Sequence, residues 1–199
     1  ATIVSAVEEG RVIYDNIRKF IRYLLSCNLG EVLTMFLASI FTLPTPLTPI
    51  QILFVNLATD GLPAIALGVD PPDRDIMRQT PRNKKESIFA RGLTEKIVVR
   101  GCLIGICTLL SFIIARLYGM DLATCRTISL STLVMSQLIH VFECRSERHS
   151  IFQIKLFTNI YLVGAVTVSI IMLCSVIYIP FFQGVFHTVS LEFKQWLII

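Results

Sequence analysis

The sequence predicts an all-α membrane protein, a bundle of about six membrane-spanning helices with a cytoplasmic stalk that extends from it into water. Two observations lead to this class. Of the 199 residues, 54% are hydrophobic and only 16% are charged, whereas roughly a quarter of the residues of a soluble domain are charged. The apolar residues also gather into stretches of about 17 to 25 residues, which is the length that a helix needs to cross a bilayer.

The first segment, from Val7 to Phe41, is longer than a membrane span requires. Its first half carries seven charged residues: Glu8, Glu9, Arg11, Asp15, Arg18, Lys19 and Arg22. From about Phe20 the segment becomes apolar. We therefore expect one continuous helix, with residues 1–20 as a water-exposed stalk and residues 21–41 as the first span. The helix should end before Pro44, because proline lacks a backbone N–H and restricts the residue before it.

Five further apolar stretches predict the remaining spans, the last of them incomplete. They cover residues 49–67, 97–118, 128–142, 157–179 and 191–199. Pro49 suits the first turn of a helix, and Pro180 follows the fifth span. Because the chain starts without Met and stops inside an apolar run, we expect it to be a piece of a longer protein, with residues 21–199 as its transmembrane domain.

Two basic connections orient the predicted bundle. Between residues 70 and 91 there are six basic residues and four acidic ones, and a second basic segment covers residues 145–155. Cytoplasmic connections of membrane proteins carry an excess of Lys and Arg. Both connections, together with the stalk, are therefore predicted to lie in the cytoplasm.

Two predicted spans carry polar residues where lipid is expected. Asn28 and Glu31 lie three residues apart in the first span. In the second span, Asn56, Thr59 and Asp60 have the spacing of one helical face. A charged group at the centre of a bilayer costs roughly 2.5 to 3.5 kcal/mol even on the most lenient scale. Two carboxylates on adjacent spans therefore require compensation, which a bound cation would supply.

The residue types in these spans predict a hard cation. Carboxylate, amide and hydroxyl oxygens suit such an ion, and the six cysteines and three histidines form no cluster with the spacing of a soft-metal site. Pro63 cannot donate a hydrogen bond to the carbonyl of Thr59. We expect that carbonyl to be a further oxygen ligand in a broken helix.

A structural interpretation of these residues stays open. Asn, Thr and Asp in membrane helices also hydrogen-bond to neighbouring helices. For Asn28 or Thr59 alone, this explanation is as good as an ion site. Gln137, in the predicted fourth span, would by itself be an interhelical hydrogen bond, and His140 is expected to be structural. The polar residues of the first two spans taken together favour an ion site.

Several motifs in the first 90 residues point to a known family. They are Val7-Glu8-Glu9-Gly10-Arg11, Ile17-Arg18-Lys19-Phe20-Ile21-Arg22-Tyr23, Asn28-Leu29-Gly30-Glu31, Val55-Asn56-Leu57-Ala58-Thr59-Asp60-Gly61-Leu62-Pro63-Ala64 and Asp70-Pro71-Pro72. These motifs resemble those of the P-type calcium-transporting ATPases, and the resemblance extends over the whole chain. It implies that the spans are the fifth to tenth membrane helices of such a pump and that the stalk leaves its phosphorylation domain.

The resemblance also implies a role for each polar residue. Asn28, Glu31, Thr59 and Asp60 match one calcium site, and Asn56 with Asp60 matches half of a second. The rest of the second site is expected from a glutamate on a fourth membrane helix outside this sequence. The phosphorylated aspartate and the domains that bind ATP and Mg²⁺ are likewise expected outside it, so the fragment should not be active alone.

One position departs from the pattern of two-site calcium pumps. Where such pumps place a glutamate on the eighth helix, this sequence has Gln137, which keeps an oxygen ligand but loses a negative charge. The resemblance thus implies a weakened first site. Because Glu31 is retained, transport of one or of two calcium ions per cycle stays open.

The function that the resemblance implies is ATP-driven export of Ca²⁺ in exchange for protons. The short outside connections favour a bacterial plasma membrane. Expected partners are the lipid bilayer and the missing N-terminal helices and cytoplasmic domains of the same pump, with no nucleic acid. Two alternatives remain: a pump of the same superfamily that carries another ion, such as Mn²⁺ or protons, and a purely structural membrane anchor.

Overall fold

The computed structural model describes residues 2–72, 76–78, 87–90, 92–145 and 158–199. Five helical segments in this part of the chain are long and apolar enough to cross a membrane. They are α1 (Ile3–Ile40), the segment Pro49–Gly68, α4 (Leu93–Leu117), α5 (Leu122–Cys144) and α6 (Ile160–Tyr178). The described residues contain no β-strand, and the predicted all-α membrane class is confirmed.

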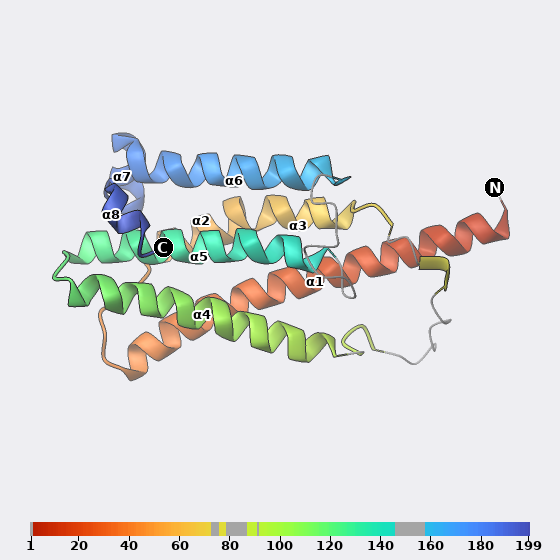
Figure 1. Ribbon diagram of the computed structural model, residues 1–199, viewed down its shortest axis with the longest axis horizontal. Helices are drawn as coiled ribbons and strands as arrows, with labels where there is room; N and C mark the ends of the chain where they lie inside the picture. The colour runs from red at the N-terminus through yellow and green to blue at the C-terminus, as the bar shows by residue number, and fades with distance from the viewer. Residues whose placement is uncertain (1, 73–75, 79–86, 91, 146–157) are drawn as a thin grey trace.

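The long helices run side by side, and the chain reverses direction between successive ones (Figure 1). The end of the second span, the start of α4, the end of α5 and the start of α6 therefore lie at one end of the bundle. α1 crosses the bundle obliquely, and its first turns project beyond the other helices at this same end (Figure 1). This is the end that the basic connections assign to the cytoplasm.

The charged residues of the stalk are less exposed than the sequence predicts. Arg18 and Lys19, which were expected in water, are 4% and 3% exposed. Arg18 donates a hydrogen bond to the backbone carbonyl of Ile88 at 2.9 Å, and Lys19 forms an ion pair with Asp70 at 2.8 Å. The prediction fails here because the connection between the second span and α4 covers this side of the stalk.

Two helices begin earlier than hydropathy predicts. α4 begins at Leu93 instead of residue 97, directly after Gly92, whose φ of 75° favours glycine. α5 begins at Leu122 instead of residue 128, and Asp121 caps it by accepting a hydrogen bond from the backbone N–H of Thr124 at 3.1 Å. The hydrogen bonds from the Thr124 side chain and backbone hold the pKa of Asp121 below its usual range. The first turns of both helices are polar, so hydropathy alone does not indicate where these helices begin.

α1 and α4 pack closely at three glycines. A β-carbon at Gly101 would come within 2.8 Å of the Leu29 side chain, and one at Gly105 would come within 2.9 Å of the carbonyl oxygen of Gly30. Gly101 and Gly105 lie one turn apart, which is the pattern of small residues at closely packed membrane helices. α4 is therefore held against the backbone of α1 directly beside Glu31.

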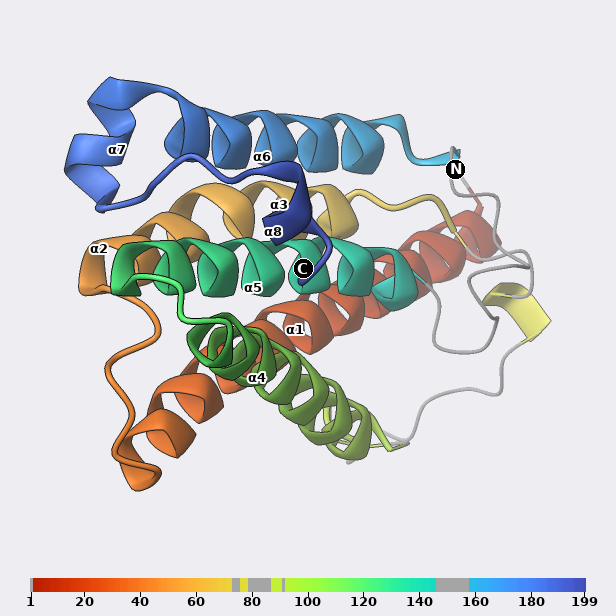
Figure 2. The same ribbon diagram turned by 60° about the vertical axis from the view of Figure 1, so that its left-hand side comes forward.

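The end of the bundle opposite the stalk carries a short helix, α7 (Pro180–Phe186). It lies beside the start of the second span (Figure 2), where the Gln51 side chain donates to the carbonyl of Phe186 at 3.0 Å. Of residues 191–199, where an incomplete sixth span was predicted, the structure forms only α8 (Phe193–Trp196) as helix.

Candidate cation site

Two carboxylates are buried inside the bundle. Glu31 on α1 is 4% exposed, and Asp60 in the second span is 1% exposed. Gln137 on α5 is fully buried between them, and its Nε2 donates to Glu31 Oε1 at 3.0 Å and to Asp60 Oδ2 at 3.2 Å. Three segments that are far apart in the sequence therefore meet at one amide group.

The remaining carboxylate oxygens also accept hydrogen bonds. Asn56 Nδ2 donates to Glu31 Oε2 at 2.6 Å, and the hydroxyl of Tyr23 donates to Asp60 Oδ1 at 3.2 Å. Neither carboxylate forms an ion pair with Lys, Arg or His in the part of the chain that the structure describes. In this part of the chain their partners are thus amide, phenol and thiol groups and not cations.

The second span changes its hydrogen-bonding pattern at the site. It consists of α2 (Pro49–Phe54), the π-helix η1 (Val55–Thr59) and α3 (Gly61–Gly68). The backbone N–H of Asp60 donates to the carbonyl of Val55, five residues back, at 2.9 Å. Single π-turns inside α-helices are rare and occur frequently at functional sites. This turn contains Asn56 and Thr59 and ends at Asp60.

The π-turn ends before Pro63, the residue from which the sequence predicts a broken helix. Ser169 of α6 donates to the carbonyl oxygen of Thr59 at 3.4 Å. A neighbouring helix thus supplies a donor where Pro63 cannot, and the role of this carbonyl as an oxygen ligand stays a prediction. The hydroxyl of Thr59 donates to the carbonyl of Val55 at 3.0 Å.

Asn28 lies apart from the other predicted ligands. Its side chain is exposed, and its Nδ2 donates to the carbonyl of Leu24 in its own helix at 2.8 Å. Glu31 shares its buried face of α1 with Cys27 and Tyr23, at spacings of four residues, whereas Asn28 is about 100° from Cys27 around the helix. Sequence analysis missed the contact of Tyr23, although this four-residue spacing pointed to it.

Gln137 Oε1 is buried and has no hydrogen-bond partner among the described residues. Buried polar atoms are normally paired, so this acceptor lacks either a donor or a cation. Rotation of the amide about its last torsion would turn the oxygen toward Glu31 and Asp60. Carboxylate, amide and hydroxyl oxygens are the ligand types that Ca²⁺ takes in proteins. The described residues contain no group of three or more His, Cys, Asp or Glu that could hold a metal ion instead.

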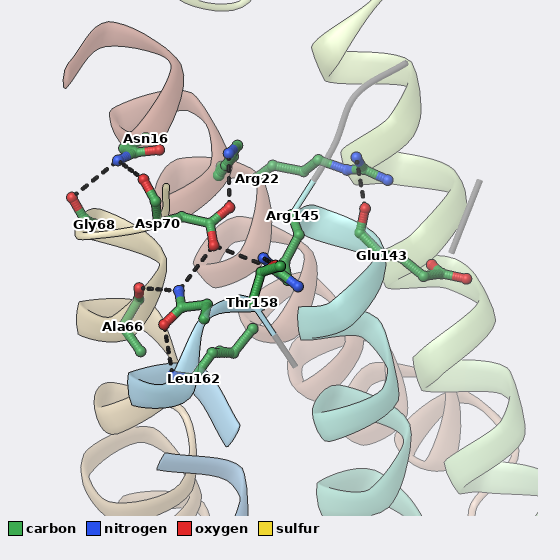
Figure 3. Close-up of polar contacts among 11 residues, drawn as sticks. Asn16, Arg22, Ala66, Gly68, Asp70, Glu143, Arg145, Thr158 and Leu162 are labelled. Carbon is green, nitrogen blue, oxygen red and sulfur yellow. Dashed lines mark hydrogen bonds and ion pairs between the residues drawn. The ribbon is translucent and has the colours of Figure 1, made fainter. Parts of the chain in front are cut away.

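A second polar cluster joins the same helices at the stalk end of the bundle (Figure 3). Asp70 accepts hydrogen bonds from Lys19 at 2.8 Å, from Arg145 at 3.1 Å and from Asn159 at 2.8 Å. Asn16 donates to the backbone carbonyl of Asp70 at 2.9 Å. We call these five residues the Asp70 hub. It fixes the relative positions of the helices that carry the candidate site.

Comparison with known proteins gives consistent matches. The family described as "Cation transporting ATPase, C-terminus" matches residues 44–199. A calcium-transporting ATPase of Bacillus subtilis is 54% identical over 200 residues, which cover 100% of this chain and 22% of the relative. Calcium-transporting ATPase 1 of Bacillus cereus is 43% identical over 212 residues, covering 98% of this chain and 24% of the relative.

A eukaryotic relative matches over the same extent. The endoplasmic reticulum calcium ATPase srcA of Aspergillus fumigatus is 34% identical over 227 residues, covering 98% of this chain and 23% of the relative. The chain thus spans less than a quarter of the length of these three relatives.

Proposed function

Because the chain belongs to the cation-transporting ATPase C-terminus family, we propose that it is the membrane part of an ATP-driven P-type calcium pump. In this proposal, Ca²⁺ binds between α1, the π-turn of the second span and α5. The observation that carries it is the meeting of two buried carboxylates, Glu31 and Asp60, at the amide of Gln137 with no cationic side chain beside them in the described part of the chain.

The donor set supports Ca²⁺ as the transported ion. Ca²⁺ takes six to eight oxygen ligands in a flexible geometry, and Glu31, Asn56, Thr59, Asp60 and Gln137 supply oxygens of three chemical kinds. The amides now donate to the carboxylates, and a half-turn of each would present its oxygen to the ion. Asn28, which is exposed and bonded to the carbonyl of Leu24 in its own helix, is outside this set.

Charge balance supports one Ca²⁺ per cycle. Two carboxylates neutralise one divalent ion, and Gln137 adds an oxygen without adding charge. When the ion leaves, the two carboxylates again lie inside a membrane without a cationic partner, which is costly. We therefore propose that protons replace the departing Ca²⁺.

The continuity of α1 supports a direct coupling between site and stalk. ATP and Mg²⁺ would bind in domains outside this chain, to which the stalk leads. Because α1 is one helix from Ile3 to Ile40, a displacement of the stalk would reach Glu31 without a hinge. The Asp70 hub would pass the same displacement to the helices that carry Asp60 and Gln137. The Bacillus relatives support a bacterial plasma membrane as the location.

Replacement of one carboxylate in the full-length pump tests this proposal. In the Asp60→Asn variant, the Ca²⁺ concentration for half-maximal phosphoenzyme formation should rise more than about tenfold, which corresponds to about 1.4 kcal/mol. The reason is the loss of a charged ligand that no other described residue replaces.

Asp121→Asn is the matched control, because Asp121 is an exposed carboxylate just before α5. Its Ca²⁺ dependence should equal that of the wild type. An unchanged Ca²⁺ dependence in Asp60→Asn would contradict the site. A phosphoenzyme that forms with Mn²⁺ and not with Ca²⁺ would assign the pump to another ion.

A further inference from the structure

A groove with a cavity of about 180 Å³ lies between α4 and α5 in the cytoplasmic half of the bundle. Its mouth is formed by Arg100 and Glu143, and its body includes Leu103 and Ile139. We propose that this groove binds an anionic phospholipid of the cytoplasmic leaflet, with the phosphate at Arg100 and part of an acyl chain along Leu103 and Ile139. This site is separate from the cation site and does not depend on which ion the pump carries.

The shape of the groove follows from the antiparallel course of the two helices. Arg100 Nε pairs with Glu143 Oε2 at 2.9 Å at the cytoplasmic end. Cys107 on α4 and Ser136 on α5 line the groove seven residues further along each helix. Seven residues of α-helix span about 10 Å, so the groove extends by this distance from a charged mouth into the membrane.

The body of the groove suits a hydrocarbon chain. Leu103 and Ile139 are 49% and 60% exposed, and Ile104, which is buried, also lines the groove. Because these side chains belong to predicted membrane spans, we expect them to face lipid. An apolar wall of this kind offers nothing to a free ion, whereas an acyl chain can lie along it without leaving an apolar environment.

The mouth carries one arginine paired with one carboxylate. The Arg100 side chain is 37% exposed and makes its ion pair through Nε, and the described residues give its two terminal nitrogens no partner. Both ring nitrogens of His140 have partners, since its Nδ1 lies 3.2 Å from Glu143 Oε2 and its Nε2 lies 3.3 Å from Cys144 Sγ. A guanidinium with two terminal nitrogens available can bind a phosphate in a bidentate manner.

A second guanidinium reaches the same end of α5. Arg22 extends from α1 toward Glu143 (Figure 3), and its NH1 lies 3.5 Å from the backbone carbonyl of Glu143. Arg22 is only 6% exposed, and its Nε has no hydrogen-bond partner in the described part of the chain. Arg22 thus reaches the backbone of Glu143, whereas Arg100 pairs with its carboxylate. Two arginines and one carboxylate leave one net positive charge at this end of the groove. Basic pockets between membrane helices on the cytoplasmic side bind anionic headgroups.

Quenching by brominated lipids tests the proposal in the full-length pump. A Leu103→Trp substitution places an indole in the groove, and its fluorescence is compared in vesicles that contain brominated phosphatidylglycerol or brominated phosphatidylcholine at the same mole fraction. The relative association constant should favour phosphatidylglycerol by about fivefold, which corresponds to about 1 kcal/mol per basic residue.

A second substitution identifies the group that selects the headgroup. Added to Leu103→Trp, Arg100→Leu should reduce the preference to about one, whereas Arg116→Leu, at the exposed opposite end of α4, should leave it unchanged. Equal quenching by both lipids with Arg100 present would overturn the proposal. Absence of quenching by either lipid would also overturn it, because another membrane segment would then fill the groove.

A measurement without substitutions covers the case in which a variant does not fold. Native mass spectrometry of the wild-type pump from mixed vesicles should show phosphatidylglycerol retained over phosphatidylcholine. Equal retention of the two lipids would contradict the proposal.

Discussion

Two buried polar clusters lie along the same helices and differ in whether their carboxylates have cationic partners. In the Asp70 hub, one carboxylate is held by the two cations Lys19 and Arg145. In the candidate cation site, the two carboxylates Glu31 and Asp60 have amide, phenol and thiol donors and no cationic partner among the described residues. The carboxylate of the hub thus has cationic partners, whereas those of the candidate site have none among the described residues. Uncompensated carboxylates in a buried site favour a binding role over a structural one.

The largest expected effect comes from breaking the hub. Asp70→Asn leaves Lys19 and Arg145 buried without a carboxylate, and removal of one partner of a buried ion pair costs about 3 to 5 kcal/mol. The change in the free energy of unfolding is measured by the labelling of the buried thiol of Cys144 at increasing denaturant concentration. Glu9→Gln, on the exposed first turns of the stalk, should leave the labelling unchanged. Equal labelling of Asp70→Asn and the wild type would remove the contrast between the clusters.

The same chemical change at the cation site should have the opposite sign. Without Ca²⁺, Asp60→Asn removes an uncompensated charge and should leave the protein as stable as the wild type or more stable. Ca²⁺ at 100 times the wild-type Kd should stabilise the wild type by about 2.7 kcal/mol and a variant whose Kd is ten times higher or more by about 1.4 kcal/mol or less. Labelling of the buried thiol of Cys27 with and without Ca²⁺ measures both effects. An ion-free Asp60→Asn protein that is as unstable as Asp70→Asn would show that Asp60 is structural.

A smaller effect is expected at the close packing contact between α1 and α4. Gly105→Ala places a β-carbon 2.9 Å from the carbonyl oxygen of Gly30, and such overpacking costs about 1 to 3 kcal/mol. Because Glu31 follows Gly30, the Ca²⁺ affinity should fall as well. Gly164→Ala is the control, since a β-carbon there meets open space. A wild-type Ca²⁺ affinity in Gly105→Ala would show that α4 does not help to position Glu31.

The smallest effect belongs to the start of α5, away from both clusters. Asp121→Ala removes a helix cap, which costs about 0.5 to 2 kcal/mol. Because hydrogen bonds lower the pKa of Asp121 in the folded protein, this contribution is fully present above the ordinary Asp pKa of about 3.9. It is lost as the pH falls through the lower, folded value. The pH dependence of Cys125 labelling, compared between wild type and variant, checks the sign.

The sequence could predict the two charged residues of the site but not their surroundings. A carboxylate inside an apolar span is costly wherever it points, so Glu31 and Asp60 stood out without any contact information. Gln137 was identified as a ligand only through the family resemblance, because an amide in a membrane helix has many structural uses. The contacts of Tyr23 and Lys19 depend on residues about 40 and 50 positions away in the chain, which neither spacing nor hydropathy encodes.

Equilibrium binding of radiolabelled Ca²⁺ to the full-length pump tests most directly the claim that one ion lies between Glu31, Asp60 and Gln137. The wild type should bind one Ca²⁺ per pump, and Glu31→Gln should lose it at concentrations that saturate the wild type. Gln137→Glu, which adds a carboxylate beside the other two, should retain the ion. One Ca²⁺ bound with unchanged affinity in Glu31→Gln would contradict the account.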